Sequence, residues 1–347
     1  MTDRQKDFAE FFSKYKSKFK QRKVLIWGAW YRGLDVQRAL KQIGIDIAGY
    51  IDSNPMKKQY GQPEKTVTTA DILKKEKYFV IVSLVDHTSV YDFFDECSYV
   101  EYEDYLYIGK SVEISGIKHT FRDEIGNSIK GDTGNAKIVL GGNSKIIIGK
   151  DVMFKGKVEI RCLWNSTIVI NDGAVIEGGT LIVEDNSILE LGKNVRLHSN
   201  YYVSIIKCAK TRIGNFTTLG SGLDLRVHEY SEFSCGEDCM FSYDIKIRAN
   251  HGHGIIDRKR NIVKKYNNAI KIGSHVWVGM GGVILAGTEI GAHSMVGAGS
   301  IVNKKFPDYV TLAGNPAKII KEDTDWIREN PYPDREYSIN ECTSELI

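Results

Sequence analysis

Residues 272–302 read IGSHVWVGMGGVILAGTEIGAHSMVGAGSIV, and an aliphatic residue followed by glycine recurs in them at a fixed spacing. The pairs Ile272-Gly273, Ile290-Gly291 and Val296-Gly297 are separated by multiples of six. The pairing continues upstream at longer, nearly constant steps, at Ile148-Gly149, Ile170-Asn171, Leu191-Gly192, Ile213-Gly214 and Cys235-Gly236. A fixed period of this size indicates stacked units that cannot bury their apolar side alone.

Each period predicts one coil of three short strands, with an aliphatic residue pointing inward and a small residue at the corner. Coils of three hexads are tight, and the longer upstream coils carry extra residues at their corners. A sandwich does not keep a six-residue register, so we predict a β-helix over residues 137–320. Residues 321–347 are predicted as a C-terminal cap and tail, in which Thr324 to Glu329 forms a short helix over the open end.

The N-terminal third follows a different pattern. Residues 1–22 predict an amphipathic helix, whose apolar face is formed by Phe8, Phe11, Phe12, Tyr15 and Phe19. Residues 23–112 alternate strands and helices, which predicts a small α/β domain of Rossmann-like type with a parallel sheet. The expected strands are 23–27, 47–51 and 79–82, the expected helix is 33–42, and residues 113–136 form a connector.

A strand-to-helix turn, Gly28 to Gly33, could hold a nucleotide in this domain, together with Asp52 at the end of the next strand. A phosphate loop needs small residues so that backbone N–H groups can approach the pyrophosphate, and bulky Trp30 stands in its middle. A structural domain and a nucleotide-binding domain therefore both remain open.

Composition excludes several classes of protein. The chain has 347 residues, 42% hydrophobic and 26% charged, with a net charge of +3. Such a balance does not favour binding to nucleic acid or to a membrane surface. We also expect no secretory signal and no transmembrane segment. The six scattered cysteines do not resemble a secreted disulfide framework, so a cytoplasmic location is expected.

The segment from Ile272 through Val302 to Ala313-Gly314-Asn315-Pro316-Ala317-Lys318 resembles the hexapeptide-repeat acyltransferases, in particular the sugar and surface-polysaccharide O-acetyltransferases. This resemblance implies a left-handed parallel β-helix, a homotrimer, and acetyl-CoA bound in a groove between neighbouring β-helices. The α/β unit resembles the small domain that precedes the β-helix in some acetyltransferases of nucleotide-linked amino sugars.

The register is lost once, between Ala249 and Ile272, where an insertion begins Asn250-His251-Gly252-His253. Transfer of an acetyl group to a hydroxyl needs a base, and histidine, with an ordinary pKa of about 6.5, suits that role. The resemblance places the family's catalytic histidine at His253, and His251 stands where the family usually has an acid.

His251 is therefore a second catalytic candidate, which would hold the acceptor or the thioester oxygen. Candidates for contact with the acceptor, or for orienting His253, are Asn250, Asp244, Asp257 and Arg258.

Small residues along the coil edges are expected to accommodate the pantetheine arm of CoA: Gly279, Gly281, Gly282, Ala286, Gly297 and Ala298. Trp277 is expected beside the thioester, and Lys304, Lys305 and Lys318 near the phosphates. The chemistry needs no metal. We interpret Cys235 and Cys239 as small buried thiols, with a metal pair or an acyl carrier as the alternatives.

The favoured function is acetyl-CoA-dependent O-acetylation of a sugar in surface polysaccharide or glycolipid synthesis. The alternatives are N-acetylation of a nucleotide-linked amino sugar and a β-helix that binds a sugar or nucleotide without turnover.

Overall fold

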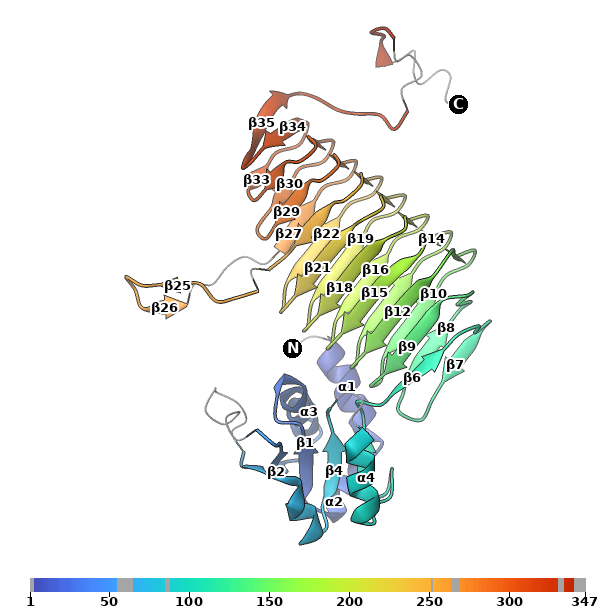
Figure 1. Ribbon diagram of the computed structural model, residues 1–347, viewed down its shortest axis with the longest axis vertical. Helices are drawn as coiled ribbons and strands as arrows, with labels where there is room; N and C mark the ends of the chain where they lie inside the picture. Colours follow the sequence, from blue (N-terminus) through green and yellow to red (C-terminus); the bar gives the residue numbers. More distant parts are fainter. Residues whose placement is uncertain are drawn as a thin grey trace.

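The computed structural model describes residues 3–54, 65–84, 88–250, 252–263, 269–329 and 334–339. A long parallel β-helix stands on a small α/β domain, and one hairpin projects from its side (Figure 1). The predicted fold class, a left-handed β-helix behind a small N-terminal α/β domain, is confirmed. No helix within the described ranges is both long and apolar enough to cross a membrane.

The α/β domain contains a five-stranded sheet in the order β3-β2-β1-β4-β5, and all its pairings are parallel. This order is typical of the doubly wound fold. The strands are β1 (Val24–Trp27), β2 (Ile47–Ile51), β3 (Val67–Thr68), β4 (Phe79–Val82) and β5 (Tyr105–Tyr107). The helices are α1 (Asp3–Ser13), α2 (Lys16–Gln21), α3 (Tyr31–Gln42) and α4 (Thr88–Glu96), with a 3-10 turn η2 at Ala70–Lys74.

Alternate residues of each strand face opposite sides of this sheet. Ile26 and Ile81 pack with α1, α2 and α3, whereas Leu25 and Val80 pack with α4. The sheet is therefore covered on both sides, as a parallel sheet requires.

The β-helix has three faces, each built from strands of successive coils. Face 1 contains β6 (Ser111–Ile114), β9 (Lys137–Gly141), β12 (Val158–Leu163), β15 (Gly179–Glu184), β18 (Tyr201–Ile206), β21 (Asp224–His228), β24 (Lys246–Arg248), β29 (Val283–Leu285) and β32 (Ile301–Val302). Face 2 contains β7 (Thr120–Arg122), β8 (Ser128–Lys130), β10 (Lys145–Ile148), β13 (Thr167–Ile170), β16 (Ile188–Leu191), β19 (Lys210–Ile213), β22 (Glu232–Cys235), β27 (Ala269–Ile272), β30 (Glu289–Ile290) and β33 (Lys305–Phe306). Face 3 contains β11 (Met153–Phe154), β14 (Val175–Ile176), β17 (Arg196–Leu197), β20 (Thr218–Leu219), β23 (Met240–Phe241), β28 (Trp277–Val278), β31 (Met295–Val296), β34 (Val310–Gly314) and β35 (Ala317–Glu322). We name the corners by the faces they join: corner 1–2, corner 2–3 and corner 3–1.

The coils become shorter toward the C-terminus. In the first coils, Ile146 pairs with Ile168, and Ile168 pairs with Leu189. In the last coils, Ile272 pairs with Ile290 and Ile290 with Phe306, so each partner lies closer along the chain. Face 1 absorbs much of the difference, because its strands shorten from six residues in β12, β15 and β18 to two in β32.

Corner 1–2 is held by a ladder of asparagines in the wide coils. The Asn143 amide donates to Asn165 (3.1 Å), and the Asn165 amide donates to Asn186 (2.9 Å). All three have left-handed backbone, a conformation that asparagine tolerates better than most residues. The last rung, Asn186, donates to Asp35 of α3 at 2.9 Å, so the ladder ends on the α/β domain.

The expected connector, residues 113–136, is itself part of the β-helix. β6 pairs antiparallel with β9, and β7 pairs antiparallel with β8, so the two strands close the first coil. Phe8 of α1 packs edge-on against Trp164 at 6.0 Å, in one core shared with Phe12 and Phe19. The N-terminal helices therefore join the α/β domain to the β-helix.

The C-terminal end differs from the prediction. The expected helix over Thr324 to Glu329 is not formed, and the prediction was wrong. Instead, β35 pairs antiparallel with β34 and covers the last coil, and residues 323–329 run in extended form back along corner 2–3. Side-chain contacts with several coils hold this strap in place of helical hydrogen bonds.

Candidate active site

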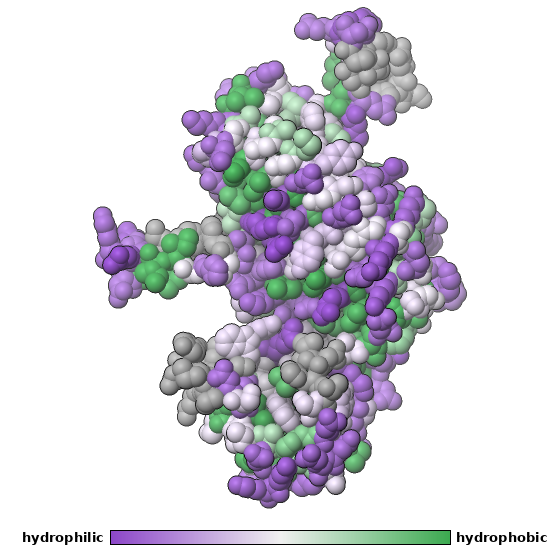
Figure 2. Space-filling model, in the orientation of Figure 1, coloured by the Kyte–Doolittle hydropathy of each residue, from purple (hydrophilic) through white to green (hydrophobic). Residues whose placement is uncertain are grey.

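The insertion forms an arm that leaves the β-helix at corner 1–2, between β24 and β27. Its described tip is an antiparallel hairpin of β25 (Ile256–Asp257) and β26 (Ile262–Val263). The hairpin exposes four aliphatic side chains, from 44% for Ile255 to 66% for Val263, which is unusual for a surface loop. Figure 1 shows it projecting from the side of the β-helix, and Figure 2 shows hydrophobic residues along it.

His253 is exposed at the base of this hairpin. His251 lies outside the described residues. Asn250 is the last described residue at the root of the arm, and its amide lies 3.5 Å from the Glu229 carboxylate one coil below. The arm thus begins beside Glu229.

The two candidate acids take other positions. Asp257 Oδ1 accepts the backbone N–H groups of Lys259 (3.0 Å) and Arg260 (3.2 Å), so this carboxylate closes the hairpin turn. Asp244 lies at corner 3–1, the far edge of face 1 from the arm. Arg258 is exposed in the hairpin turn. Within this chain, neither acid is shown to orient His253.

The small residues expected to line CoA form a row on corner 3–1. This row comprises Gly279, Gly281, Gly282, Gly297 and Ala298. Close stacking of the coils requires glycine at position 279, because a Cβ there would lie 2.8 Å from the backbone N of Ala298. Ala286 lies apart from the row, on corner 1–2.

Trp277 lies on face 3 beside this row, half-exposed, and its indole N–H donates to Ser242 Oγ at 3.1 Å. The lysines are dispersed: Lys304 is at corner 1–2, Lys305 on face 2 pairs with Glu289 at 2.7 Å, and Lys318 is on β35. They do not form a single phosphate cluster in one chain.

The arm and the small-residue row lie on opposite edges of face 1. β24 and β29 cross that face with three residues each, which spans about 10 Å at ~3.3 Å per residue. Because the arm projects away from its own β-helix, one chain does not bring His253 onto its own row (Figure 1).

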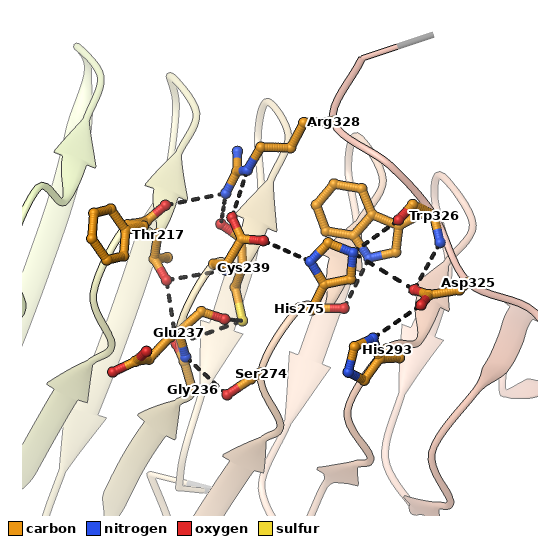
Figure 3. A network of polar contacts seen from close by, with 12 residues as sticks. Thr217, Gly236, Glu237, Cys239, Ser274, His275, His293, Asp325, Trp326 and Arg328 are labelled. Atoms are coloured by element: carbon orange, nitrogen blue, oxygen red, sulfur yellow. Dashed lines mark hydrogen bonds and ion pairs between the residues drawn. The ribbon is translucent and has the colours of Figure 1, made fainter. Parts of the chain in front are cut away.

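Sequence reasoning missed a polar network on corner 2–3, next to Trp277 (Figure 3). His275 Nδ1 lies 2.7 Å from Asp238, and its Nε2 lies 2.8 Å from the carbonyl oxygen of Trp326, whose ring stacks on the imidazole at 4.3 Å. Burial alone would lower the pKa of His275, but the Trp326 carbonyl and the carboxylates of Asp238 and Asp325 raise it above its ordinary value.

Arg328 completes the network by donating to Asp238 at 2.7 Å and to the carbonyl of Cys239 at 3.1 Å. His275, His293 and Asp325 also bring three potential metal-ligand atoms within 4.8 Å of one another. Hydrogen bonds occupy them, since His293 Nδ1 lies 3.0 Å from Asp325 and His275 holds Trp326. The network therefore fastens the strap.

Cys235 and Cys239 are buried in the β-helix, 4% and 0% exposed. The Cys239 thiol donates to the carbonyl oxygen of Gly273 at 3.2 Å. A hydrogen bond to Cys239 and burial raise the pKa of Cys235 well above its ordinary value. Both thiols therefore act as small core residues, in agreement with the sequence interpretation.

In the α/β domain, Gly28, Gly33 and Asp52 meet at the carboxyl edge of the sheet. The Asp52 carboxylate accepts the N–H of Ala29 at 2.9 Å, inside the turn that would have to face a phosphate. A Cβ on Gly33 would lie 2.0 Å from the Gly28 carbonyl, so close packing requires that glycine. These contacts give the three residues a structural role.

The chain was compared with protein families, known sequences and solved structures. No family model matches the chain. It is 35% identical over 138 residues to the polysialic acid O-acetyltransferase of Escherichia coli O1:K1, covering 39% of this chain and 45% of that protein. The solved structure of the polySia-specific acetyltransferase NeuO is 30% identical, covering 64% of this chain and 86% of that chain, with a TM-score of 0.44. The chain is therefore similar to known O-acetyltransferases of saccharides.

The galactoside O-acetyltransferase of Escherichia coli K12 is 27% identical over 176 residues, covering 47% of this chain and 85% of that protein. The chain spans less than half the length of the polysialic acid O-acetyltransferase. The predicted resemblance is confirmed, and these names support the prediction of an O-acetyltransferase.

Proposed function

We propose that this protein is an acetyl-CoA-dependent O-acetyltransferase that modifies a saccharide hydroxyl in surface polysaccharide or glycolipid synthesis. The observation that carries the proposal is the arm. The β-helix keeps its register except at one insertion, and that insertion presents His253 to solvent. The relatives named for polysialic acid and galactosides support a saccharide acceptor.

In the proposed reaction His253 acts as the general base. One ring nitrogen takes the proton of the acceptor hydroxyl as the oxygen attacks the acetyl carbonyl carbon. Backbone N–H groups stabilise the negative charge that develops on the carbonyl oxygen. The C–S bond then breaks, and the imidazolium returns the proton to the CoA thiolate.

The small-residue row on corner 3–1 fits the pantetheine arm of acetyl-CoA. Each residue of the row has no side chain or a single methyl group, so an extended chain of amides could approach the backbone there, beside the exposed side chain of Met280. Trp277 would flank the thioester end, and Lys318 would lie toward the phosphates. A cytoplasmic location, where acetyl-CoA is made, belongs to this proposal.

A homotrimer would complete the site. The arm and the row lie on opposite edges of face 1, so a neighbouring copy would have to bring its row to the arm. Three prisms packed about an axis place the edge of one beside the edge of the next. The exposed aliphatic residues of the arm, Ile256 and Val263 among them, would then be covered by that neighbour.

Our test uses the full chain with acetyl-CoA, and with oligosialic acid and methyl β-galactoside as acceptors. We expect His253→Ala to lower kcat about 100-fold or more, the usual contribution of a general base, without changing the affinity for acetyl-CoA. His119→Ala, an equally exposed histidine at the far end, should leave both unchanged. Sedimentation should give three times 39.1 kDa. Absence of acetyl-CoA binding, or full activity of His253→Ala, would contradict the proposal.

A further inference from the structure

A cavity of about 420 Å³ lies between the α/β domain and the β-helix, within the size range of small-molecule sites. One wall is the first turns of α3, with Trp30, Tyr31 and Asp35. The other wall is corner 1–2, where Lys207, Glu229 and Tyr230 come from two successive coils. Neither domain forms the cavity alone.

Two aromatic side chains at this cavity are unusually exposed, Trp30 at 45% and Tyr230 at 71%. The backbone of Tyr230 is left-handed, with φ 63°, and so is that of Glu229, with φ 57°. Such a conformation costs non-glycine residues of order 1 kcal/mol or more and is concentrated at functional sites. The same corner position is left-handed in the wide coils below, where it holds Asn165, Asn186 and Cys208. The left-handed backbone is therefore a property of the corner, and what distinguishes this coil is the exposed tyrosine ring that it carries beside the cavity.

The charged residues of the cavity are paired with one another. Lys207 Nζ lies 2.8 Å from Glu229, and Arg38 lies 3.2 Å from Asp35. Burial raises the pKa of Asp35 to about 6. The cavity therefore offers both donors and acceptors, and its three carboxylates, Asp35, Asp185 and Glu229, outnumber its two cations, Arg38 and Lys207.

This chemistry suits a sugar ring better than a phosphate. Carboxylates at the wall would repel a phosphate, and the N–H of Ala29 in the adjacent turn is already bound to Asp52. A sugar presents hydroxyl groups that both donate and accept, and apolar C–H faces that pack on aromatic rings.

One residue of the cavity wall, Glu229, also contacts the root of the arm. Glu229 contacts Lys207 through one carboxylate oxygen and the Asn250 amide, at the root of the arm, through the other. A ligand in the cavity would therefore extend along corner 1–2 toward the segment that carries His253. From these observations we infer that the interdomain cavity is a saccharide subsite that holds a ring of the acceptor adjacent to the one being acetylated. The role of this subsite in acetyl transfer rests on the proposed function, whereas the binding of a saccharide in the cavity does not.

The test compares Trp30→Ala and Tyr230→Asn with wild type, using the full chain. Asparagine at position 230 removes the ring and suits the left-handed backbone. Phe216→Asn is the matched control, because Phe216 is also exposed (55%) and left-handed (φ 59°) but lies on corner 2–3. The probes are methyl β-galactoside, as a neutral saccharide, and UDP, measured by calorimetry, with acetyl-CoA titrated separately.

We expect a saccharide to bind wild type, and both cavity variants to weaken it at least tenfold. Phe216→Asn should change it less than twofold, and acetyl-CoA affinity should not change. Unaltered saccharide affinity in both cavity variants, no saccharide binding to wild type, or binding of UDP alone would overturn the inference. Saccharide bound in the cavity without acetyl transfer would leave the subsite standing and remove the proposed function.

Discussion

Single residues in this β-helix are constrained mainly by the coil above or below them. Gly279 shows this, because the coil that begins after Ile290 passes within van der Waals distance of its missing Cβ. Gly297, in the next coil, has more room, with its nearest contact at 3.3 Å. The sequence pattern identifies both glycines as corner residues, but only the stacking distance separates a required glycine from a tolerant one.

Gly279→Ala should therefore destabilise the protein more than Gly297→Ala. The added methyl group would lie 2.8 Å from backbone atoms on the next coil, and overpacking of this kind costs about 1–3 kcal/mol. Thermal unfolding of the two variants checks this, and equal melting temperatures would contradict it. Both residues lie on the proposed CoA row, so a drop in acetyl-CoA affinity common to both would be a separate effect on binding.

At the level of elements, the strap over residues 323–329 could not have been predicted. Its fastening residues, Asp238, His275 and Arg328, are separated by up to 90 positions and carry no local pattern. The polar run after the last coil was interpreted as a helix because local composition permits one. The position of the arm in the sequence could be predicted, because the repeat loses its register there. Its hairpin and its outward direction could not be predicted.

The strap should be held more firmly in mild acid than in mild base. The folded pKa of His275 is raised, so its contribution to stability is full below its unfolded pKa of about 6.5 and is lost as pH rises through the folded pKa. Asp238, whose pKa is lowered despite burial because Arg328 and His275 lie beside it, stays ionised throughout this range.

Hydrogen exchange measures this effect. Protection of residues 323–329, corrected for intrinsic rates, should be greater at pH 6 than at pH 8.5. His275→Asn, which keeps the left-handed backbone of φ 55°, should abolish the difference. A pH dependence that persists in His275→Asn would assign the effect to another group.

At the scale of the molecule, two domains of different design are joined by a buried ion pair. Asp185, 2% exposed at corner 1–2, accepts hydrogen bonds from Arg32 Nε at 2.5 Å and from the Tyr31 hydroxyl at 2.8 Å. The sequence predicted both domains, because each has its own periodicity. Their contact, and the cavity beside it, could not be predicted, since Arg32 of α3 and Asp185 of the corner are 153 positions apart.

Asp185→Asn should weaken the junction strongly. Asparagine matches the shape of aspartate and suits the left-handed backbone, so the change leaves Arg32 buried without its main partner. Breaking a buried pair costs about 3–5 kcal/mol. Urea unfolding should show this loss, whereas Asp172→Asn, an exposed carboxylate beside Lys193, should change stability by about 0.5 kcal/mol or less. Similar values for the two variants would mean that other contacts hold the domains together.

The asparagine ladder limits how the β-helix can be lengthened by design. Its three rungs fix how many coils separate the first turn of the β-helix from the α/β domain. One extra coil between Asn143 and Asn186 would displace Asp185 by about 4.8 Å and carry it out of reach of Arg32. Coils beyond Tyr230 carry no such constraint from α3, and there the strap, whose Arg328 reaches back to Asp238 and to the carbonyl of Phe216, sets the number of coils instead.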